Sequence, residues 1–371
     1  MIGKICHLTS VHGRYDNRIF FKECSSLASN NWEVHLVVAD GKGDEVLNNV
    51  SIWDVGLQKG RFERFFKTTQ KVYKKAVELN AQIYHFHDPD LIPSGLRLRK
   101  MDKIVFYDIH EDYRTQILIK PWINKYLRRI TSFLFGKYED YAIKRFDGIL
   151  VPQTGMINYF IHLNKNTKFV ANSIIIDDKF DLDEKDYTNK ISFHPGTLSK
   201  ERGVYNMVRA FEYLDKNELI LAGPFESQQL LNNTELLEGW KSVKYLGKRP
   251  YSEIKEYHKQ ASIGLILFEN VGQYHFAFTV KLFEYMYFGT AVLLPNFGDW
   301  IAFNEKYKCG INVDSNNPEK VAEIITYLND NPKIKKQLGE NGRKAVLEEL
   351  NWGSDEKRLL ELYDSIELRD L

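Results

Sequence analysis

Short apolar, β-branched runs alternate with longer stretches of helical periodicity along the whole chain. Parallel strands buried on both faces have such continuous apolar sequences, and repeated strand–helix alternation predicts parallel sheets covered by helices. The runs form two series, so we expect two sheets. The strands expected in the first are Lys4–Leu8, Val34–Ala39, Ile83–His87, Ile104–Asp108 and Gly148–Pro152. Those expected in the second are Ile191–His194, Glu218–Ala222, Val243–Leu246, Ile263–Phe268 and Ala291–Pro295. The expected helices include Asn17–Asn30, Val204–Leu214, Tyr251–Gln260 and Pro318–Asp330.

A polar, acidic stretch within residues 171–189 separates the two series. The chain has 371 residues, which is more than one hydrophobic core usually organises, so we expect two domains that meet in this stretch. Ligands of open α/β sheets bind at the carboxyl ends of the strands. Two facing sheets would therefore place the active site between the domains. The acidic residues of the stretch are Asp177, Asp178, Asp181, Asp183, Glu184 and Asp186.

Composition is that of a water-soluble globular protein. Apolar residues make up 43% of the chain and charged residues 27%, which leaves ample material for a core. No apolar run is long enough to span a membrane, and the N-terminus has no secretory signal pattern. The three cysteines are far apart and offer neither a disulfide framework nor a zinc pattern. These features predict a cytoplasmic protein.

Charge is distributed unevenly along the chain. The net charge is only +1, but residues 1–172 carry an excess of Lys and Arg, and the remainder carries an excess of Asp and Glu. A basic half indicates an anionic partner for that half. A membrane surface or a phosphorylated lipid fits better than nucleic acid, because no nucleic-acid-binding module is recognisable.

The segment from Thr279 to Gly289 carries the most specific pattern of charged and capping residues. Thr279 is a typical N-cap and Gly289 a typical helix stop. The first turn of such a helix presents backbone N–H groups and the positive end of its dipole to an anion, and Lys281 adds a full charge. Glu284 lies one turn further on the same face. A cation for a diphosphate and a carboxylate for ribose hydroxyls suit a nucleotide. A capped helix with a surface salt bridge is the alternative.

A second segment, from Phe193 to Val204, ends a strand, passes through a loop and begins a helix. Gly196 and Gly203 allow the backbone to approach a ligand closely, and Arg202 can bind phosphate oxygens with two N–H groups. Many loops between a strand and a helix carry Gly and Arg, so an ordinary loop is the alternative here.

Taken in order, these segments and several others resemble the family-four glycosyltransferases. Phe283-Glu-Tyr-Met, with Lys281 before it and Gly289 after it, is similar to the donor-site helix of that family. Gly196 with Arg202-Gly203 resembles the loop before the first helix of the C-terminal domain. Further similar segments are Asp16-Asn-Arg-Ile-Phe-Phe-Lys-Glu, Tyr107-Asp-Ile-His-Glu-Asp-Tyr, Leu221-Ala-Gly-Pro, Tyr245-Leu-Gly-Lys-Arg-Pro-Tyr and Asn351-Trp352.

The resemblance implies the GT-B fold, which has two Rossmann-like domains that face each other across a cleft. It implies that residues 1–172 bind the acceptor, that residues 173–350 bind the nucleotide sugar, and that residues 351–371 form a helix that returns to the first domain. It also implies retention of anomeric configuration and catalysis without a bound metal or cofactor.

The resemblance further implies roles for individual residues. Arg202 and Lys281 stabilise the departing diphosphate, and His110 lies beside the anomeric centre of the donor. The implied donor-binding residues are Gly13, Gly196, Gly223, Arg249, Phe278, Thr279, Val280 and Glu284, and the implied acceptor-binding residues are His12, Asp16, Glu111 and Asp112.

Three positions depart from the family pattern. The family often has two glutamates, of which Glu284 is the second, and Phe276 occupies the position of the first. That first glutamate touches the transferred sugar, so the identity of the donor is open. The usual pair of glycines in the first loop is reduced to Gly13. The arginine often found just after Gly196 is Thr197.

Some of these residues also have an ordinary structural interpretation. His110 could be a hydrogen-bonded loop histidine, and Glu111 and Asp112 are equally consistent with an acidic helix start. His85, His87, Asp88 and Asp90 suggest a metal cluster, but no third ligand with suitable spacing is evident. We therefore expect no metal site.

The stretch Lys120–Arg145 has the pattern of a basic amphipathic helix. Apolar residues recur at helical spacing, and Trp122 and Phe135 add aromatic rings. Such a helix can rest on anionic lipid, or it can pack on the sheet with a solvated basic face. The apolar positions are Ile123, Tyr126, Leu127, Ile130, Phe133 and Leu134, and the cations are Lys120, Lys125, Arg128, Arg129, Lys137, Lys144 and Arg145, offset by Glu139 and Asp140.

The sequence as a whole predicts a retaining transferase that moves a hexose or N-acetylhexosamine from a nucleoside diphosphate sugar. The UDP-sugar is the first expectation and a GDP-sugar the second. The acceptor is a saccharide, expected to be lipid-linked at the inner membrane face, in bacterial surface polysaccharide synthesis. A sugar-nucleotide epimerase of the same fold and a non-catalytic sugar-nucleotide-binding subunit are the alternatives. No Gly-x-Gly-x-x-Gly follows the first strand, which argues against an oxidoreductase.

Overall fold

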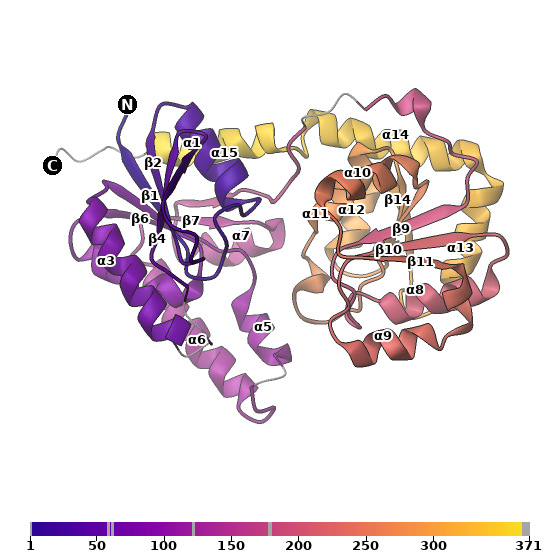
Figure 1. The fold of residues 1–371 in the computed structure, drawn as a ribbon, viewed down its shortest axis with the longest axis horizontal. Coiled ribbons are helices and arrows are strands. Elements are labelled where there is room, and N and C mark those ends of the chain that lie inside the picture. The colour runs from indigo at the N-terminus through magenta and orange to yellow at the C-terminus, as the bar shows by residue number, and fades with distance from the viewer. Residues whose placement is uncertain (1, 58–59, 61–62, 121–122, 177–179, 366–371) are drawn as a thin grey trace. The chain divides into compact units, whose positions relative to one another are not determined.

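The computed structural model describes residues 2–57, 60, 63–120, 123–176 and 180–365. The chain divides into two compact units, each built on its own sheet (Figure 1). The first unit comprises Met1–Asn172 and Trp352–Leu371, and the second comprises Ser173–Asn351. The predicted acidic stretch thus follows the change from one unit to the other, although its Asp177 and Asp178 lie outside the described residues.

The first unit contains an eight-stranded sheet of order β3-β4-β2-β1-β5-β6-β7-β8 in its described part. The pair β3–β4 is antiparallel and the other pairs are parallel. Its central strands are buried apolar runs, as expected for strands with helices on both faces. The strands are β1 Lys4–Leu8, β2 Glu33–Val38, β3 Glu45–Leu47, β4 Val50–Asp54, β5 Ile83–Phe86, β6 Ile104–Asp108, β7 Gly148–Val151 and β8 Thr167–Phe169.

Helices of the first unit come from both ends of the sequence. The last helix, α15, places Trp352 and Tyr363 in the core of this unit, and the Trp352 indole donates to Ser26 Oγ at 2.9 Å. Figure 1 shows α15 beside α1 and β2, far from both in sequence. The helical segments are a π-helical turn Ile19–Cys24, α1 Ser25–Ser29, Arg64–Thr68, α3 Thr69–Leu79, Pro89–Leu91, α4 Ile92–Arg99, α5 Tyr113–Ile119, α6 Arg128–Ile143, α7 Thr154–Phe160 and α15 Trp352–Asp364.

The second unit contains a six-stranded parallel sheet of order β11-β10-β9-β12-β13-β14. Two apolar clusters, one centred on α11 and one on α8, pack on it. The strands are β9 Ile191–Pro195, β10 Glu218–Ala222, β11 Val243–Gly247, β12 Ile263–Leu265, β13 Ala291–Pro295 and β14 Gly310–Val313. The helical segments are Leu182–Glu184, α8 Val204–Ala210, Phe211–Tyr213, α9 Gln228–Glu235, Glu238–Ser242, α10 Tyr251–Gln260, Gly272–His275, α11 Val280–Tyr287, α12 Asp299–Tyr307, α13 Pro318–Asp330 and α14 Pro332–Glu348.

The ten expected strands all form, which confirms the α/β class with two parallel sheets. The expected strand from Ile263 to Phe268 is wrong at its end, because β12 stops at Leu265. Four strands were not expected: β3, β4, β8 and β14. These lie at or near sheet edges and carry polar residues, so they lack the apolar run that marks a central strand.

Candidate functional site

The carboxyl edge of the second sheet brings together the two segments that the sequence singled out. β9 and β12 are neighbours in this sheet. The loop after β9 carries Arg202, and the segment after β12 leads into the first turn of α11, which carries Lys281. The backbone joins the two segments directly, because Glu269 N donates to Glu201 O at 2.8 Å. Two cations distant in sequence are thereby placed at one edge.

Gly196 provides the open space between these cations. A Cβ atom built on it would lie 3.4 Å from Lys281 Nζ and 3.5 Å from Arg202 Nη1. Its φ of +104° lies in the region that side chains rarely adopt. Any other residue would be strained there and would occupy the space that both cations face.

Lys281 is buried and is held by a neutral imidazole. His194 Nδ1 lies 2.8 Å from Leu265 O, so this nitrogen carries the proton and Nε2 is an acceptor. Lys281 Nζ donates to that Nε2 at 3.0 Å. Burial, together with the charge of Arg202, holds the pKa of Lys281 well below its ordinary value. Burial likewise lowers the pKa of His194, which keeps this imidazole neutral.

Neither Lys281 nor Arg202 has an ion pair with a carboxylate in the described part of the chain. Arg202 instead donates to Tyr274 Oη at 3.3 Å and to Thr197 O at 3.5 Å. Two adjacent cations without a counterion form an anion-binding arrangement, and their spacing around Gly196 suits a group with several oxygens such as a phosphate.

Glu284 is also buried, and it faces α10. Its Oε2 lies 3.4 Å from His258 Nε2. Burial alone would raise the pKa of Glu284, but hydrogen bonds from His258 and Tyr251 and the charge of Lys281 lower it below its ordinary value. Lys281 and Glu284 are thus two buried groups with separate imidazole partners, so the surface salt bridge considered above is wrong.

The start of α11 differs from expectation in one respect. Thr279 occupies the N-cap position, but its hydroxyl makes no capping hydrogen bond and is buried without a partner. The backbone from Phe278 to Val280 leads into the helix beside the two cations, while the Phe278 ring packs on Trp300 and Phe303. Gly289, at φ +63°, follows the end of α11 as expected.

The other predicted donor residues of this unit lie at neighbouring strand ends. Gly223 follows β10, and a Cβ atom there would lie 2.1 Å from Gly196 O, so only glycine lets the two loops approach. Arg249 lies just before α10, where Nε donates to Leu246 O at 2.9 Å. Its side chain is exposed and 3.9 Å from Glu253. Gly223 is therefore part of the edge around Gly196, whereas the recorded contacts of Arg249 are with its own loop and α10.

In the first unit the predicted acceptor residue His12 forms a pair with a buried carboxylate. His12 Nδ1 lies 3.0 Å from Asp88 Oδ1. Asp88 also accepts from Ser10 N at 2.6 Å and Thr9 Oγ1 at 2.7 Å, which fixes the loop after β1. Although burial opposes it, hydrogen bonding and charge from Asp88 raise the pKa of His12. The pair therefore favours a cationic His12 at a position that remains partly exposed.

His110 forms a second such pair one strand away. Its Nε2 lies 3.0 Å from Asp108 Oδ2 and 3.1 Å from His87 Nδ1. The rings of His12 and His110 are 4.9 Å apart, so the loops after β1 and β6 present two imidazoles side by side. Because Asp108 is an acceptor, the proton of a neutral His110 is on Nε2, which leaves Nδ1 as an acceptor.

The remaining predicted residues of this unit have structural contacts. Gly13 is exposed, and no atom lies within 4 Å of a Cβ built on it. Asp16 accepts from Arg18 N and Ile19 N at the start of the π-helical turn. Asp112 caps α5 by accepting from Arg114 N and Thr115 N, as the helix-start alternative expects. Glu111 is half-buried just before it. Their acceptor roles stay predictions.

Residues 176–345 match the family model described as glycosyl transferases group 1. The matched range contains every cation, carboxylate and glycine of the edge around Gly196. The match covers most of the second unit, Ser173–Asn351. The resemblance noted in the sequence is thereby confirmed over this range.

Solved structures similar to this protein cover nearly its whole length. Sucrose-phosphate synthase from Thermosynechococcus elongatus superposes with a TM-score of 0.73 at 15% identity, over 97% of this chain and 98% of that one. HepE from Anabaena, in complex with UDP, superposes with a TM-score of 0.72 at 14% identity, over 98% of this chain and 100% of that one. A UDP-forming α,α-trehalose-phosphate synthase from Burkholderia xenovorans superposes with a TM-score of 0.70 at 13% identity, over 99% of both chains. These likenesses confirm the GT-B fold. A search of curated proteins by sequence gives no match.

Sequence reasoning missed the partners of the predicted site residues. His194 and His258 contact Lys281 and Glu284 in the second unit, and Asp88 and Asp108 contact His12 and His110 in the first. His194, His258 and Asp88 each lie in or next to a strand or helix that does not carry the partner, so the strand order makes them neighbours. Asp108 and His110 both lie at the end of β6, where polar residues that follow an apolar strand are a sequence signal of such sites.

Proposed function

We propose that the protein is a retaining glycosyltransferase that moves a hexose or N-acetylhexosamine from a UDP-sugar to a lipid-linked saccharide. The observation that carries the proposal is the pair of cations around Gly196, which have no carboxylate partner among the described residues. A nucleoside diphosphate supplies the missing negative charge. UDP is favoured because the similar HepE structures hold UDP or UDP-glucose.

Lys281 and Arg202 would act on the leaving group. As the bond between the anomeric carbon and the diphosphate breaks, negative charge builds on the distal phosphate, and fixed cations stabilise that charge more than the ground state. The acceptor oxygen forms the new bond on the same face, and its proton passes to the departing phosphate. Atoms and charge then balance without a carboxylate nucleophile.

Glu284 would hold the ribose of the donor. Its lowered pKa keeps the carboxylate ionised, and an ionised acceptor suits the two hydroxyls of a ribose. Phe276, at the family's first glutamate position, provides no carboxylate for the transferred sugar. We infer that this enzyme recognises its sugar with other groups, of which His110 Nδ1 is one candidate acceptor.

The lipid-linked acceptor is supported by an exposed apolar stripe on the first half of α6 and the turn before it, here called the α6 surface: Tyr126, Leu127, Ile130, Phe133 and Leu134. These side chains are 54% to 76% exposed, whereas the opposite side of α6 buries Gly136, Ala142 and Ile143. A helix packed on the sheet through this stripe would bury it, whereas α6 packs through its other side and leaves the stripe exposed. A row of large exposed apolar residues marks a surface that contacts a partner or a membrane.

Charges on the same helix favour a membrane over a protein. Lys125, Arg129, Lys137 and Lys144 are exposed beside the α6 surface. Glu139 and Asp140 do not offset them, because both pair with Arg114, at 2.7 Å and 2.6 Å. Basic residues around an apolar stripe are typical of helices that lie on anionic lipid. No helix among the described residues is long and apolar enough to cross a bilayer, and the predicted anchor Trp122 lies outside those residues.

A transfer assay tests the proposed function. The purified protein is incubated with UDP-sugars labelled in the sugar, with and without an extract of bacterial membrane lipids. We expect label to move from the nucleotide to the lipid fraction, and NMR of the product to show the anomeric configuration of the donor. Lys281→Met provides the inactive control.

Two other outcomes would contradict the proposal. Conversion of the labelled sugar into an isomer still attached to UDP, without an acceptor, would indicate an epimerase. Binding of UDP-sugars without turnover on any lipid or soluble saccharide would indicate a binding subunit, which the aromatic residue at position 276 makes conceivable.

A further inference from the structure

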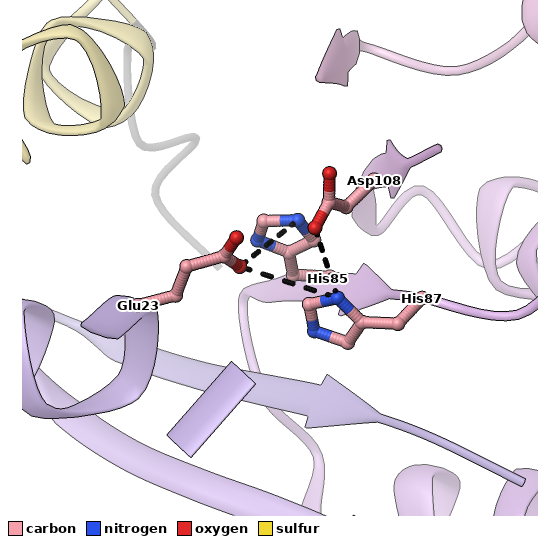
Figure 2. A group of neighbouring side chains, drawn as sticks. All are labelled: Glu23, His85, His87 and Asp108. Carbon is pink, nitrogen blue, oxygen red and sulfur yellow. Dashed lines mark hydrogen bonds and ion pairs between the residues drawn. The ribbon is translucent and has the colours of Figure 1, made fainter. Parts of the chain in front are cut away.

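A second polar cluster lies inside the first unit, away from its surface. It consists of Glu23 from the π-helical turn, His85 on β5, His87 just after β5, and Asp108 at the end of β6 (Figure 2). All four side chains are fully buried. One ligand atom from each lies within 4.8 Å of the others. The fold thus supplies the carboxylates that the sequence pattern around His85 and His87 lacked, and the expectation that no further ligand is available is wrong.

Both imidazoles are oriented toward the centre of the cluster. His85 Nδ1 lies 2.7 Å from Tyr363 Oη, and His87 Nε2 lies 2.9 Å from His7 Nδ1. His85 Nε2 and His87 Nδ1 then face the carboxylates, as Figure 2 shows. Burial lowers the pKa of His85 and lowers that of His87 to about 4, so both rings are neutral and keep a lone pair. Metal-binding histidines characteristically have the other nitrogen fixed in this way.

The cluster has fewer positive than negative charges. Arg18 pairs with Asp108 at 2.8 Å and with Glu23 at 3.0 Å, so two carboxyl groups share one guanidinium. Burial and the charge of Asp108 raise the pKa of Glu23, which favours a proton on this carboxyl when no other cation is present. Within the described residues Glu23 Oε2 and His85 Nε2 have no hydrogen-bond partner. When both carboxyls are ionised, they carry two negative charges against the single charge of Arg18, and a divalent cation can then take the place of the proton.

We propose that Glu23, His85, His87 and Asp108 bind one divalent transition-metal ion of the zinc class in a buried structural site. Two imidazole nitrogens and two carboxylate oxygens are ligands that zinc prefers, and magnesium and calcium prefer oxygens alone. His87 Nδ1 lies 3.2 Å from Asp108 Oδ2 and 4.0 Å from Glu23 Oε2, and His85 Nε2 lies 3.8 Å from Glu23 Oε2. A tetrahedral ion with bonds of about 2.0–2.1 Å holds its ligands about 3.3 Å apart, so a modest contraction closes the site.

The ion would connect the π-helical turn, β5 and β6, and through Tyr363 it would also fix α15. The role proposed for the ion is structural, although its ligand Asp108 also lies 3.0 Å from His110 Nε2. The alternative is a metal-free cluster in which Glu23 is protonated. The two states differ in metal content, which can be measured directly.

The test uses the full chain, with any affinity tag removed. Metal content is measured after purification without chelators and again after dialysis against Zn²⁺, and Co²⁺ is added to the metal-free protein. We expect about one zinc ion per chain, visible d–d bands of four-coordinate cobalt, and a rise in Tm of roughly 5 °C or more with zinc at a hundredfold excess over its Kd.

Glu23→Gln and His85→Gln locate the ion, and His35→Gln is the matched control. His35 is a buried imidazole that also contacts a carboxylate, Glu33 at 2.9 Å, but it lies outside the cluster. We expect zinc affinity to fall at least about tenfold in the two cluster variants and to stay unchanged in the control. If a cluster variant does not fold, the wild-type metal content and cobalt spectrum still decide. Metal-free wild type that gains neither cobalt bands nor thermal stability overturns the proposal, as does equal binding by Glu23→Gln.

Discussion

Buried charged side chains have different kinds of partner in the two units. In the second unit Lys281 is buried against a neutral imidazole and beside another cation, and no carboxylate pairs with either among the described residues. In the first unit several buried charges have a partner of opposite sign. Arg18 pairs with Asp108 and Glu23, Arg14 pairs with Asp40, and Arg114 pairs with Glu139.

This difference separates a ligand site from a structural network. Burying a cation without a counterion costs stability, and a ligand that supplies the counterion is one reason for a fold to keep such a residue. Where a buried charge is paired, breaking the pair leaves the other charge unsatisfied. We therefore interpret Lys281 and Arg202 as an anion-binding site, whereas Arg18 and Arg114 connect elements of the first unit through their ion pairs.

Lys281→Met should have the largest effect on activity. We expect turnover to fall by about 10²–10³-fold, because the departing diphosphate loses one of two fixed cations, while UDP-sugar affinity falls less. Removal of a buried uncompensated charge should leave Tm unchanged or raise it. Steady-state kinetics and thermal unfolding measure both. Turnover within about threefold of the wild type would show that Lys281 does not act on the leaving group.

Lys335→Met is the matched control for this variant. Lys335 is equally buried in the second unit, but it donates to Asn189 O, Ser262 Oγ and Asn329 Oδ1. We expect the reverse pattern, with a lower Tm and unchanged turnover, because those acceptors lose their donor.

Glu284→Gln should weaken binding of UDP. Losing charge-assisted hydrogen bonds to the ribose costs roughly 1.5–3 kcal/mol, which is about a tenfold to 150-fold rise in Kd. Titration calorimetry with UDP measures it. Glu256→Gln, which alters an exposed glutamate paired with Lys259, serves as the control and should change nothing. Unchanged affinity in folded Glu284→Gln would remove this carboxylate from the donor site.

Reversing charges on α6 should have a smaller effect, seen only with lipid. We expect Arg129→Glu with Lys137→Glu to reduce sedimentation with anionic vesicles, since each lost cation contributes about 1 kcal/mol near such a surface. Added salt should weaken wild-type binding too. Lys74→Glu with Lys100→Glu, on α3 and at the end of α4, is the control of equal charge. Arg128 is left intact because its side chain holds Ile123 O.

The vesicle experiment also decides between a membrane and a second copy of the chain. Wild type that ignores anionic vesicles at low salt, and dimerises through Phe133 and Leu134, would make the α6 surface a protein interface. The acceptor would then need no lipid.

Central strands and the donor helix were predictable because their signals are local. Glu218–Ala222 and Ala291–Pro295 are apolar runs with the observed bounds, and Gly289 ends α11 as expected. β4 was missed because its alternating Val-Ser-Ile-Trp-Asp sequence is short and half polar. Thr279 occupies the N-cap position of α11 as expected, yet its hydroxyl makes no capping hydrogen bond among the described residues.

Partners across the sheet were not predictable. Lys281 and Glu284 lie three residues apart and suggested a mutual salt bridge, but His194 and His258 bind them instead, from β9 and α10. The metal-type cluster was rejected for the same reason, since Glu23 is far from His85 in sequence. Local spacing identifies the residues that carry chemistry, and only strand order identifies what they touch.

The central claim is that a diphosphate supplies the counterion of Lys281, and proton-linked calorimetry tests it most directly. The pKa of free Lys281 is lowered, and a bound diphosphate raises it, so binding takes up a proton and UDP affinity falls as pH rises between the two pKa values. UDP is titrated at roughly pH 8.5, where its phosphates are fully ionised, in buffers of different ionisation enthalpy. The account predicts net proton uptake by the wild type and none by Lys281→Met. Binding without proton uptake, or equal uptake by both proteins, would contradict it.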